Sequence, residues 1–384
     1  MRRVLAAALL AAVFAVPLST ARAAEEWVFF GSHHTGPGIG FSRATFDDQT
    51  GKLGKSEFVI QVQAPAYYTF TRDGKFLYTC DSGTTFNGQP GGGVSAFSVD
   101  ARAGTLTPLN AVSAGGPDTS YVALDHSQKH VLAANYGGGS VGVWAIKPDG
   151  SLGERTAFDQ QVGTGPNPSR QTHAYAHSIQ EAPGGKFVLA ADLGDDQLYV
   201  YRYDEEKGTL TPNDPPSVHI TPGDGPRHFA FSRDARRLYL MTEMGSAIHV
   251  FDWGGDKGTL GEIQRISALP ADFKGTSTGA EILVHPNNRF VYATNRVAGS
   301  DGWVAVFSVD AATGKLTPIE EISSKGKMPR NMEFDPTGKW LIVTNHDSNN
   351  TLVFAVDGTT GKLTQTGEPV EVPYPFCPRF LAKP

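Results

Sequence analysis

The chain has 384 residues, of which 40% are apolar, so it is large enough to build one extensive core or several small ones. Its 44 glycines and 25 prolines make it rich in turns, but its apolar content excludes a disordered protein. A formal charge of −6 argues against nucleic acid or an anionic membrane surface as the main partner.

Residues 1–23 have the pattern of a signal peptide. Two arginines precede an apolar run over residues 4–16, which is too short to span a bilayer. A proline ends this run, and an Ala-Arg-Ala sequence ending at Ala23 fits a small-x-small cleavage site. We therefore expect cleavage after Ala23 and export of residues 24–384, as one soluble domain, to the periplasm or beyond. No later segment is long and apolar enough to predict a membrane span.

Two short signatures recur along the rest of the chain at intervals of about 50 residues. The first is Gly-x-Leu, and its glycines are Gly51, Gly104, Gly150, Gly208, Gly258, Gly314 and Gly361. The second is a basic residue, here called K, that follows a turn pair and precedes a short strand. The copies of K are Lys75, Lys129, Lys186, Arg236, Arg289 and Lys339.

Runs of β-branched and aromatic residues lie between these signatures, and no stretch has a helical period. Six such runs cover residues 94–99, 141–146, 198–203, 247–251, 304–309 and 351–356. Four short strands in a repeat of this length are typical of a propeller blade. The seven Gly-x-Leu copies therefore predict an all-β, seven-bladed β-propeller that forms a single domain.

The last blade is expected to be split between the two ends of the chain. Residues 378–381 look like the opening of a repeat, and residues 27–30 and 40–46 look like its later strands. Pairing them would close the ring and leave no free sheet edge. Closure would also bring Cys377 toward Cys80, and either a disulfide or two buried free thiols would fit this arrangement.

Aligning the repeats on K brings polar residues together. If the turn pair forms a tight hairpin, position K−9 opens the inner strand and lies opposite K+6, give or take one residue. The inner strands of a propeller line its central channel, so K−9 should ring one mouth of that channel. The K−9 residues are Ala66, Ser120, His177, Arg227, Ala280 and Arg330, and a Pro-Arg match adds Arg379. Position K−8 includes His228, Glu281 and Asn331, and K+7 includes Tyr136, Glu243, Arg296 and His346.

Both a structural and a functional interpretation of this ring stay open. Asn and Asp at K+6 are expected to satisfy turn amides, because such residues often end strands. Arginines in a channel need a carboxylate or a ligand anion, and Glu243, Glu281 or Asp192 could serve as internal partners. A concave mouth that combines Arg, Glu and His is nevertheless the first candidate for an active site.

Motifs of several enzyme classes are missing from the sequence. It has no nucleophile elbow, no HExxH and no phosphate-binding loop, and no histidine pair has ligand spacing on a shared predicted face. We therefore expect no metal and no cofactor. General acid–base chemistry remains: His177 could exchange a proton with water, Glu243 could orient it or act as the base, and Arg227 could stabilise an oxyanion. Arg330 and Arg296 could anchor a substrate carboxylate or phosphate.

Motifs at these positions fall in order in consecutive blades and cover nearly the whole chain after the signal peptide. They are His177-Ser178, Gly-Asp-Gly-Pro-Arg-His ending at His228, Ala-Glu-Ile around Glu281, Asn295-Arg296 and Pro329-Arg330-Asn331. These motifs resemble the seven-bladed lactonase family, which includes propeller-type bacterial 6-phosphogluconolactonases and fungal 3-carboxymuconate lactonizing enzymes. The resemblance implies metal-free lactone chemistry at the channel mouth, with His177, Glu243, Arg227 and Arg296 as site residues.

The combined prediction is a monomeric hydrolase of a small anionic lactone, either a sugar-acid or a carboxylated lactone. The predicted catalytic residues are His177, Glu243 and Arg227, and the predicted substrate-binding residues are Arg296, Arg330, Glu281, Arg379 and His228. 6-Phosphogluconolactone is a cytosolic intermediate that an exported enzyme would not normally meet, so the sequence does not identify the lactone. It also does not decide between hydrolysis and reversible lactonisation.

Two other classes of protein compete with this prediction. Repeats such as Tyr-Ala-Thr-Asn at residues 292–295 resemble surface-layer propellers, which would make the protein an exported binding scaffold without enzymatic activity. A scaffold, however, does not need arginines, a histidine and a glutamate in its inner ring. A quinone- or haem-linked dehydrogenase is less favoured because the chain has no CxxCH motif.

Overall fold

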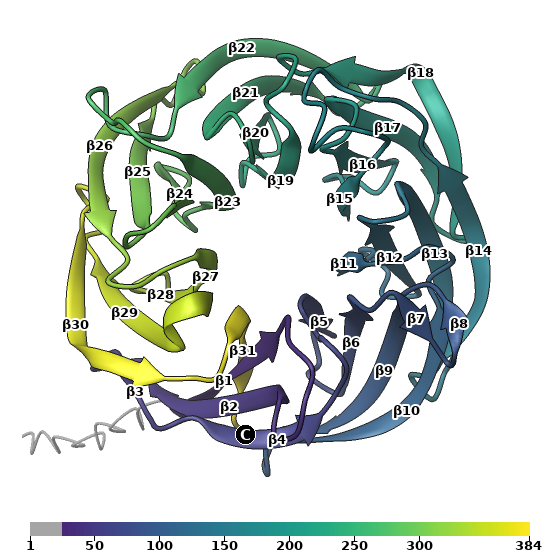
Figure 1. Ribbon diagram of the computed structural model, residues 1–384, viewed down its shortest axis with the longest axis horizontal. Coiled ribbons are helices and arrows are strands. Elements are labelled where there is room, and N and C mark those ends of the chain that lie inside the picture. Colours follow the sequence, from purple (N-terminus) through teal and green to yellow (C-terminus); the bar gives the residue numbers. More distant parts are fainter. Residues whose placement is uncertain (1–24) are drawn as a thin grey trace, which may run out of the picture.

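A computed structural model describes residues 25–384, so the predicted signal peptide lies outside the described residues. These residues form seven antiparallel sheets arranged in a ring, with successive blades following the chain around it (Figure 1). The predicted seven-bladed β-propeller is confirmed. Within residues 25–384 the only helix is a 3-10 turn, η1 (His346–Ser348), and a small hairpin, β7 (Thr85–Phe86) and β8 (Gln89–Pro90), lies outside the blades.

Each blade has four strand positions from the centre of the ring outward. The innermost strands are β5 (Tyr68–Phe70), β11 (Thr119–Leu124), β15 (Ala176–Glu181), β19 (Pro226–Phe231), β23 (Ser277–Val284), β27 (Pro329–Phe334) and β31 (Pro375–Ala382). The second strands are β6 (Phe76–Asp81), β12 (His130–Asn135), β16 (Phe187–Asp192), β20 (Arg237–Thr242), β24 (Phe290–Val297), β28 (Trp340–Asn345) and β1 (Glu25–Ser32).

The two outer positions complete the blades. The third strands are β9 (Gly93–Asp100), β13 (Ser140–Ile146), β17 (Gln197–Asp204), β21 (Ala247–Gly254), β25 (Trp303–Val309), β29 (Asn350–Val356) and β2 (Gly40–Asp47). The outermost strands are β10 (Thr105–Ser113), β14 (Leu152–Gln160), β18 (Thr209–His219), β22 (Thr259–Ser267), β26 (Leu316–Ser323) and β30 (Leu363–Glu371), with β3 (Lys52–Leu53) and β4 (Glu57–Gln61) in the last blade. All six apolar runs predicted from the sequence lie in third strands.

Strands from both ends of the chain build the seventh blade, as predicted. The C-terminal β31 is its innermost strand and pairs antiparallel with β1, with Phe29 opposite Arg379 and Val28 opposite Phe380. Because β1 also pairs with β2, the sheet continues outward from the N-terminal segment. The ring therefore closes by hydrogen bonds between strands from the two ends of the chain.

The two sequence signatures meet between neighbouring blades. All seven Gly-x-Leu glycines have a left-handed backbone, with φ between +65° and +82°, which disfavours any residue with a Cβ. A Cβ there would also lie within 2.8 Å of a side chain from the adjacent blade, and in six blades this side chain belongs to the residue that follows K. The pairs are Gly150 with Phe76, Gly208 with His130, Gly258 with Phe187, Gly314 with Arg237, Gly361 with Phe290, Gly51 with Trp340 and, across the closure, Gly104 with Trp27.

Apolar side chains of adjacent sheets fill the space between blades, and both cysteines belong to this core. Cys80 and Cys377 are buried and free, and they lie in the same apolar cluster. Of the two arrangements that the sequence left open, the structure therefore has the buried thiols. The part of the chain that the structure describes contains no helix with the length and apolar character that crossing a membrane requires.

Candidate active site

A β-bulge near the start of the inner strand sets the geometry of the channel mouth. In four blades the K−9 residue is the extra, unpaired residue, so K−10 rather than K−9 lies opposite K+6. These residues are Ser120, His177, Arg227 and Arg330. The expected pairing of K−9 with K+6 is therefore off by one residue. Because a bulge changes the direction of a side chain, it accounts for these residues facing the mouth rather than a neighbouring strand.

The bulged residues line a cavity of about 170 Å³. Position K−9 supplies His177, Arg227 and Arg330 to its wall, position K+7 supplies Glu243 and Arg296, and position K−8 supplies His228. Six of the eight predicted site residues therefore share one cavity, although they come from four different blades. Aligning the repeats on K was enough to bring these six together.

Glu243 is the centre of the charged groups in this cavity. Its carboxylate lies 2.9 Å from Arg296 Nη2, 3.2 Å from Arg227 Nε and 2.5 Å from Arg170 Nη2. Burial alone would raise its pKa, but the arginines, Arg296 and Arg227 foremost, hold the pKa of Glu243 well below its ordinary value. Glu243 is therefore a fixed negative charge that orients the arginines around it.

His177 lies beside Glu243, with Nε2 3.9 Å from a carboxylate oxygen, and its Nδ1 has no hydrogen-bond partner among the described residues. Its ring packs against Tyr136 and His228, with centroids 5.3 Å and 5.1 Å away. Burial, together with the charge of Arg227, holds the pKa of His177 well below its ordinary value. The imidazole is thus neutral at physiological pH and able to accept a proton.

Arg330 differs from the other arginines in the cavity because it forms no ion pair with the residues that the structure describes. Its buried Nε has no hydrogen-bond partner among them, and its guanidinium lies 5.1 Å from the ring of Phe376. Burial and the nearby Arg296 and Arg227 lower its pKa to about 9, so it remains charged at neutral pH. A half-buried cation without a carboxylate partner is stabilised when a ligand anion completes it.

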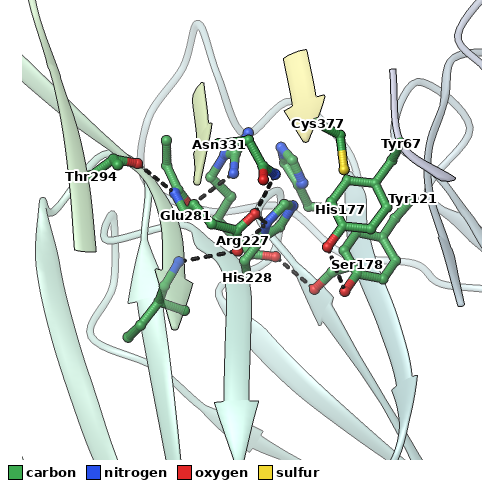
Figure 2. A network of polar contacts seen from close by, with 12 residues as sticks. Tyr67, Tyr121, His177, Ser178, Arg227, His228, Glu281, Thr294, Asn331 and Cys377 are labelled. Atoms are coloured by element: carbon green, nitrogen blue, oxygen red, sulfur yellow. Dashed lines mark hydrogen bonds and ion pairs between the residues drawn. The ribbon is translucent and has the colours of Figure 1, made fainter. Parts of the chain in front are cut away.

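The K−8 residues form a polar network around His228, which is part of the cavity wall (Figure 2). His228 Nδ1 lies 3.1 Å from both carboxylate oxygens of Glu281, and Asn331 donates to the same carboxylate. On the other side the hydroxyls of Tyr67 and Tyr121 are 3.1 Å apart. Burial raises the pKa of Glu281 to about 7. Glu281 does not line the cavity, so the predicted direct contact with substrate is corrected: it reaches the cavity only through His228.

The placement of Arg379 on this mouth is wrong. Phe376, not Arg379, is the wall residue that the innermost strand of the seventh blade supplies, because β31 is bulged between Pro375 and Pro378. Arg379 lies three residues further along the strand, where it pairs with Glu333 and donates to the Tyr67 hydroxyl at 2.6 Å. The Pro-Arg match misled because proline and arginine occur together at two different depths of the inner strands.

Side chains at K+6 bond to the backbone, but only the aspartates accept from turn amides as predicted, whereas the asparagines donate to carbonyls. Asn135, Asn295 and Asn345 each donate an amide N–H to a backbone carbonyl at 2.7–3.0 Å. Asp81 and Asp192 accept from backbone N–H groups of the turns that follow them. Within residues 25–384 no group of three or more His, Cys, Asp or Glu side chains is placed to hold a metal ion.

Five wall residues were not named from the sequence, and one of them, Ser82, is the K+7 residue of the Lys75 repeat. His33 follows β1 and Phe376 is in β31, so they are the K+7 and K−9 residues of the split blade, and carrying the register across the closure would have found them. Asp118 and Arg170 lie on the connections that lead into β11 and β15. No repeat signal marks them, because these connections differ in length and sequence from blade to blade.

Similarity to known proteins extends over nearly the whole described chain. Residues 27–380 match the family described as "Lactonase, 7-bladed beta-propeller". The chain is 35% identical to the 6-phosphogluconolactonase of Bacillus subtilis over 353 residues, which cover 92% of this chain and 97% of that protein. It is 26% identical to the 6-phosphogluconolactonase of Formosa agariphila over 329 residues, or 85% and 91% of the two chains. Among solved structures, the periplasmic gluconolactonase of Pseudomonas aeruginosa matches with a TM-score of 0.87 and 30% identity, covering 94% of this chain and all of that one.

Proposed function

The chain belongs to the lactonase family of seven-bladed β-propellers and is a lactone hydrolase, and from this premise we propose that its substrate is a lactone carrying an anionic group. The sequence-based prediction of a lactonase is confirmed by these relatives, and they do not favour the alternative of a binding scaffold. Within the family, the proposal concerns which lactone is opened and which residues open it.

The unpaired Arg330 is the observation that carries the proposal. Four arginines line the cavity, and among residues 25–384 Glu243 is the one carboxylate that forms ion pairs with any of them. Glu243 pairs with Arg170, Arg227 and Arg296 together, which leaves Arg330 without an ion-pair partner in the described part of the chain. A carboxylate or phosphate on the substrate would supply it and accept paired hydrogen bonds from the guanidinium.

In the proposed reaction a water molecule attacks the lactone carbonyl and gives a proton to His177. Neutral His177 suits this role, whereas Glu243 is a poor base because three arginines stabilise its charge. Arg227 donates from Nε to Glu243 and from Nη1 to the Ala280 carbonyl, and its Nη2 makes no hydrogen bond to a described residue. That group is available to the oxyanion that develops on the carbonyl oxygen. The new C–O bond forms, the ring C–O bond breaks, and the ring oxygen takes up a proton.

The relatives differ in the charge of the lactone that their names give. Those from Bacillus subtilis and Formosa agariphila are named for a phosphorylated sugar lactone, and the Pseudomonas aeruginosa protein is named for gluconolactone and for the periplasm. Export through residues 1–23, which we also propose, would favour a lactone found outside the cytosol. A carboxylated sugar lactone fits both observations, because it can occur outside the cytosol and its carboxylate can pair with Arg330.

The test is base consumption at constant pH with the purified protein and two matched lactones, glucono-δ-lactone and its 6-phosphate. The expected result is ring opening well above the spontaneous rate, with kcat/KM about tenfold or more higher for the anionic member, which corresponds to one charge-assisted contact. Equal kcat/KM for the two lactones would overturn the proposal that the substrate carries an anionic group. If neither these two nor carboxylated lactones are opened faster than they open spontaneously, the proposed hydrolysis by this cavity fails.

A further inference from the structure

Asp118 is a wall residue of the cavity that the reaction above does not use. It lies on the connection between β10 and β11, and β11 lies across the central opening from β23 and β27 (Figure 1). No arginine occupies K−9 or K+7 in the two blades that this connection joins. Two wall residues of these blades, Ser82 and Ser120, are neutral.

The backbone of Asp118 is held in an uncommon conformation. Its φ is +54°, in the left-handed region, which a residue with a Cβ occupies at a cost. Two hydrogen bonds fix it there: its N–H donates to the Gly83 carbonyl at 3.1 Å, and its carbonyl accepts from the Tyr136 N–H at 2.8 Å. Two neighbouring turns thus impose this conformation on Asp118. The position carries an aspartate, although a glycine would adopt the same backbone more easily.

The side chain that this backbone presents has no partner. Within residues 25–384 the Asp118 carboxyl makes no hydrogen bond and no ion pair, whereas most aspartates in the turns of this ring bond to nearby backbone N–H groups, as Asp81 does to Gly83. Burial raises the pKa of Asp118 to about 6, and the charge of Arg330 opposes this rise. A carboxyl group in this state can exist in either protonation form near neutral pH.

Lactone opening also requires a proton donor for the leaving ring oxygen, and the other wall residues are poorly suited to this role. When the ring C–O bond breaks, the leaving oxygen of an aliphatic lactone becomes a strongly basic alkoxide and needs a proton. The four arginines hold their protons more tightly than a carboxyl group does. His177 takes up the proton of the attacking water and lies next to Arg227, on the side of the cavity that the carbonyl oxygen would face.

This inference rests on the proposed function. We propose that Asp118 is a further catalytic residue, the general acid that protonates the ring oxygen as the lactone C–O bond breaks. The proton moves from the Asp118 carboxyl to the leaving oxygen, the bonding pair stays on that oxygen, and the product is a hydroxy acid. The proton that water gave to His177 then returns through solvent to the carboxylate, so no proton is gained or lost in this step. A substrate anion that pairs with Arg330 also favours the protonated form of Asp118, both by its own charge and by neutralising that arginine.

The test compares two carboxylated lactones that differ in the leaving oxygen. A carboxylated δ-valerolactone releases an alkoxide, whereas a carboxylated dihydrocoumarin releases a phenoxide whose conjugate acid has a pKa of about 10. Asp118→Asn keeps the left-handed backbone and the shape of the side chain but cannot donate a carboxyl proton, and Asp118→Gly removes the side chain without backbone strain. Asp81→Asn, in the adjacent turn outside the cavity, is the matched control.

The expected result is a fall in kcat of about a hundredfold or more for the δ-valerolactone in both Asp118 variants, which is the usual contribution of a positioned acid. For the dihydrocoumarin the fall should be less than about threefold, because a phenoxide leaves without assistance. Equal losses on both lactones would overturn the proposal and leave Asp118 a positioning role, and unchanged kcat on both would overturn any role. If the unaltered protein opens neither lactone, the proposed function itself fails, which is distinguishable from both of these outcomes.

Discussion

Two rings of residues run around this propeller, and they differ in how much they repeat. The turn ring consists of the seven Gly-x-Leu glycines, each packed on a side chain of the adjacent blade. The mouth ring consists of the residues at K−9, namely Ala66, Ser120, His177, Arg227, Ala280, Arg330 and the structurally equivalent Phe376. In the turn ring every blade uses the same residue type at the same φ. In the mouth ring the position repeats but the chemistry does not.

The difference teaches how one repeated frame carries both a fold and a site. A left-handed turn under a bulky neighbour admits little besides glycine, so the turn ring is set by backbone and packing constraints that are equal in all blades. The bulge at the mouth constrains direction but not side-chain type, so that each blade can contribute a different group to one cavity. We therefore expect mutations in the mouth ring to reduce turnover and mutations in the turn ring to reduce stability.

Replacing His177 by alanine should have the largest effect on turnover, because it removes the proposed base. A positioned base contributes about 10² to 10⁴ in rate, so we expect kcat to fall within this range while the thermal midpoint changes little. His219→Ala, at an exposed position of β18, is the matched control. A variant with normal kcat would show that His177 only packs in the cavity wall. It would also contradict the expectation that mutations in the mouth ring reduce turnover.

The pH dependence of kcat gives an independent view of the same residue. Burial and Arg227 hold the pKa of His177 well below its ordinary value of about 6.5, so the imidazole stays neutral and able to accept a proton in mildly acidic solution. For the unaltered protein acting on the carboxylated dihydrocoumarin, whose leaving oxygen does not need the Asp118 proton, we expect kcat to remain level as pH falls through 6.5 and to decline only at lower pH. A decline centred at the ordinary histidine pKa would contradict the buried, neutral imidazole.

Arg227→Ala should lower kcat by about a hundredfold or more, the usual cost of removing one oxyanion donor. Arg227→Lys keeps the charge but loses the planar two-pronged geometry, so we expect only partial recovery. Arg102→Ala, on an exposed turn, controls for the loss of an arginine as such. Full recovery of kcat by lysine would indicate that charge alone matters and that the guanidinium does not contact the oxyanion.

In the turn ring, Gly361→Ala should lower stability and leave kcat unchanged. The new Cβ would require a left-handed backbone at φ +78° and would lie 2.5 Å from the Phe290 ring. We expect a loss of about 1–3 kcal/mol in the free energy of unfolding, measured by urea denaturation. Gly358→Ala, in the same turn with no atom near its Cβ, should lose much less. Equal losses for the two would show that the contact between blades is not what requires glycine.

The smallest of these effects is expected for Arg170→Ala. Arg170 is partly exposed on the connection before β15, and Glu243 remains bonded to Arg227 and Arg296 without it. A partly exposed ion pair contributes about 0.2–1 kcal/mol, so kcat/KM should fall by no more than about fivefold. A loss as large as that of Arg227→Ala would mean that Arg170 itself contacts the reacting atoms.

Much of the fold and most of the cavity could be predicted from the sequence because both follow the repeat. The Gly-x-Leu glycines gave the number of blades, and alignment on K brought His177, Arg227 and Arg296 to one wall. The register was off by one residue because a bulge adds a residue without a distinctive sequence signal.

Residues outside the repeat could not be predicted in this way. Asp118 and Arg170 enter the cavity from connections that differ in length and sequence from blade to blade, and only the folded chain shows that these two residues line the mouth. Arg379 shows the opposite error, because a local Pro-Arg match was given more weight than the register of β31. His33 was missed since its blade is completed only when the two ends of the chain pair.

The central claim is that the cavity opens an anionic lactone and that Arg330 holds the anion, and a double-mutant cycle tests it most directly. The measurement is kcat/KM for glucono-δ-lactone and its 6-phosphate, each with the unaltered protein and with Arg330→Ala. We predict that the substitution lowers kcat/KM for the phosphorylated lactone by about tenfold or more and for the neutral one by less than about twofold, mainly through KM. Equal losses on the two lactones would contradict a contact between Arg330 and the substrate anion, and with it the proposed reason for an unpaired arginine in the mouth ring.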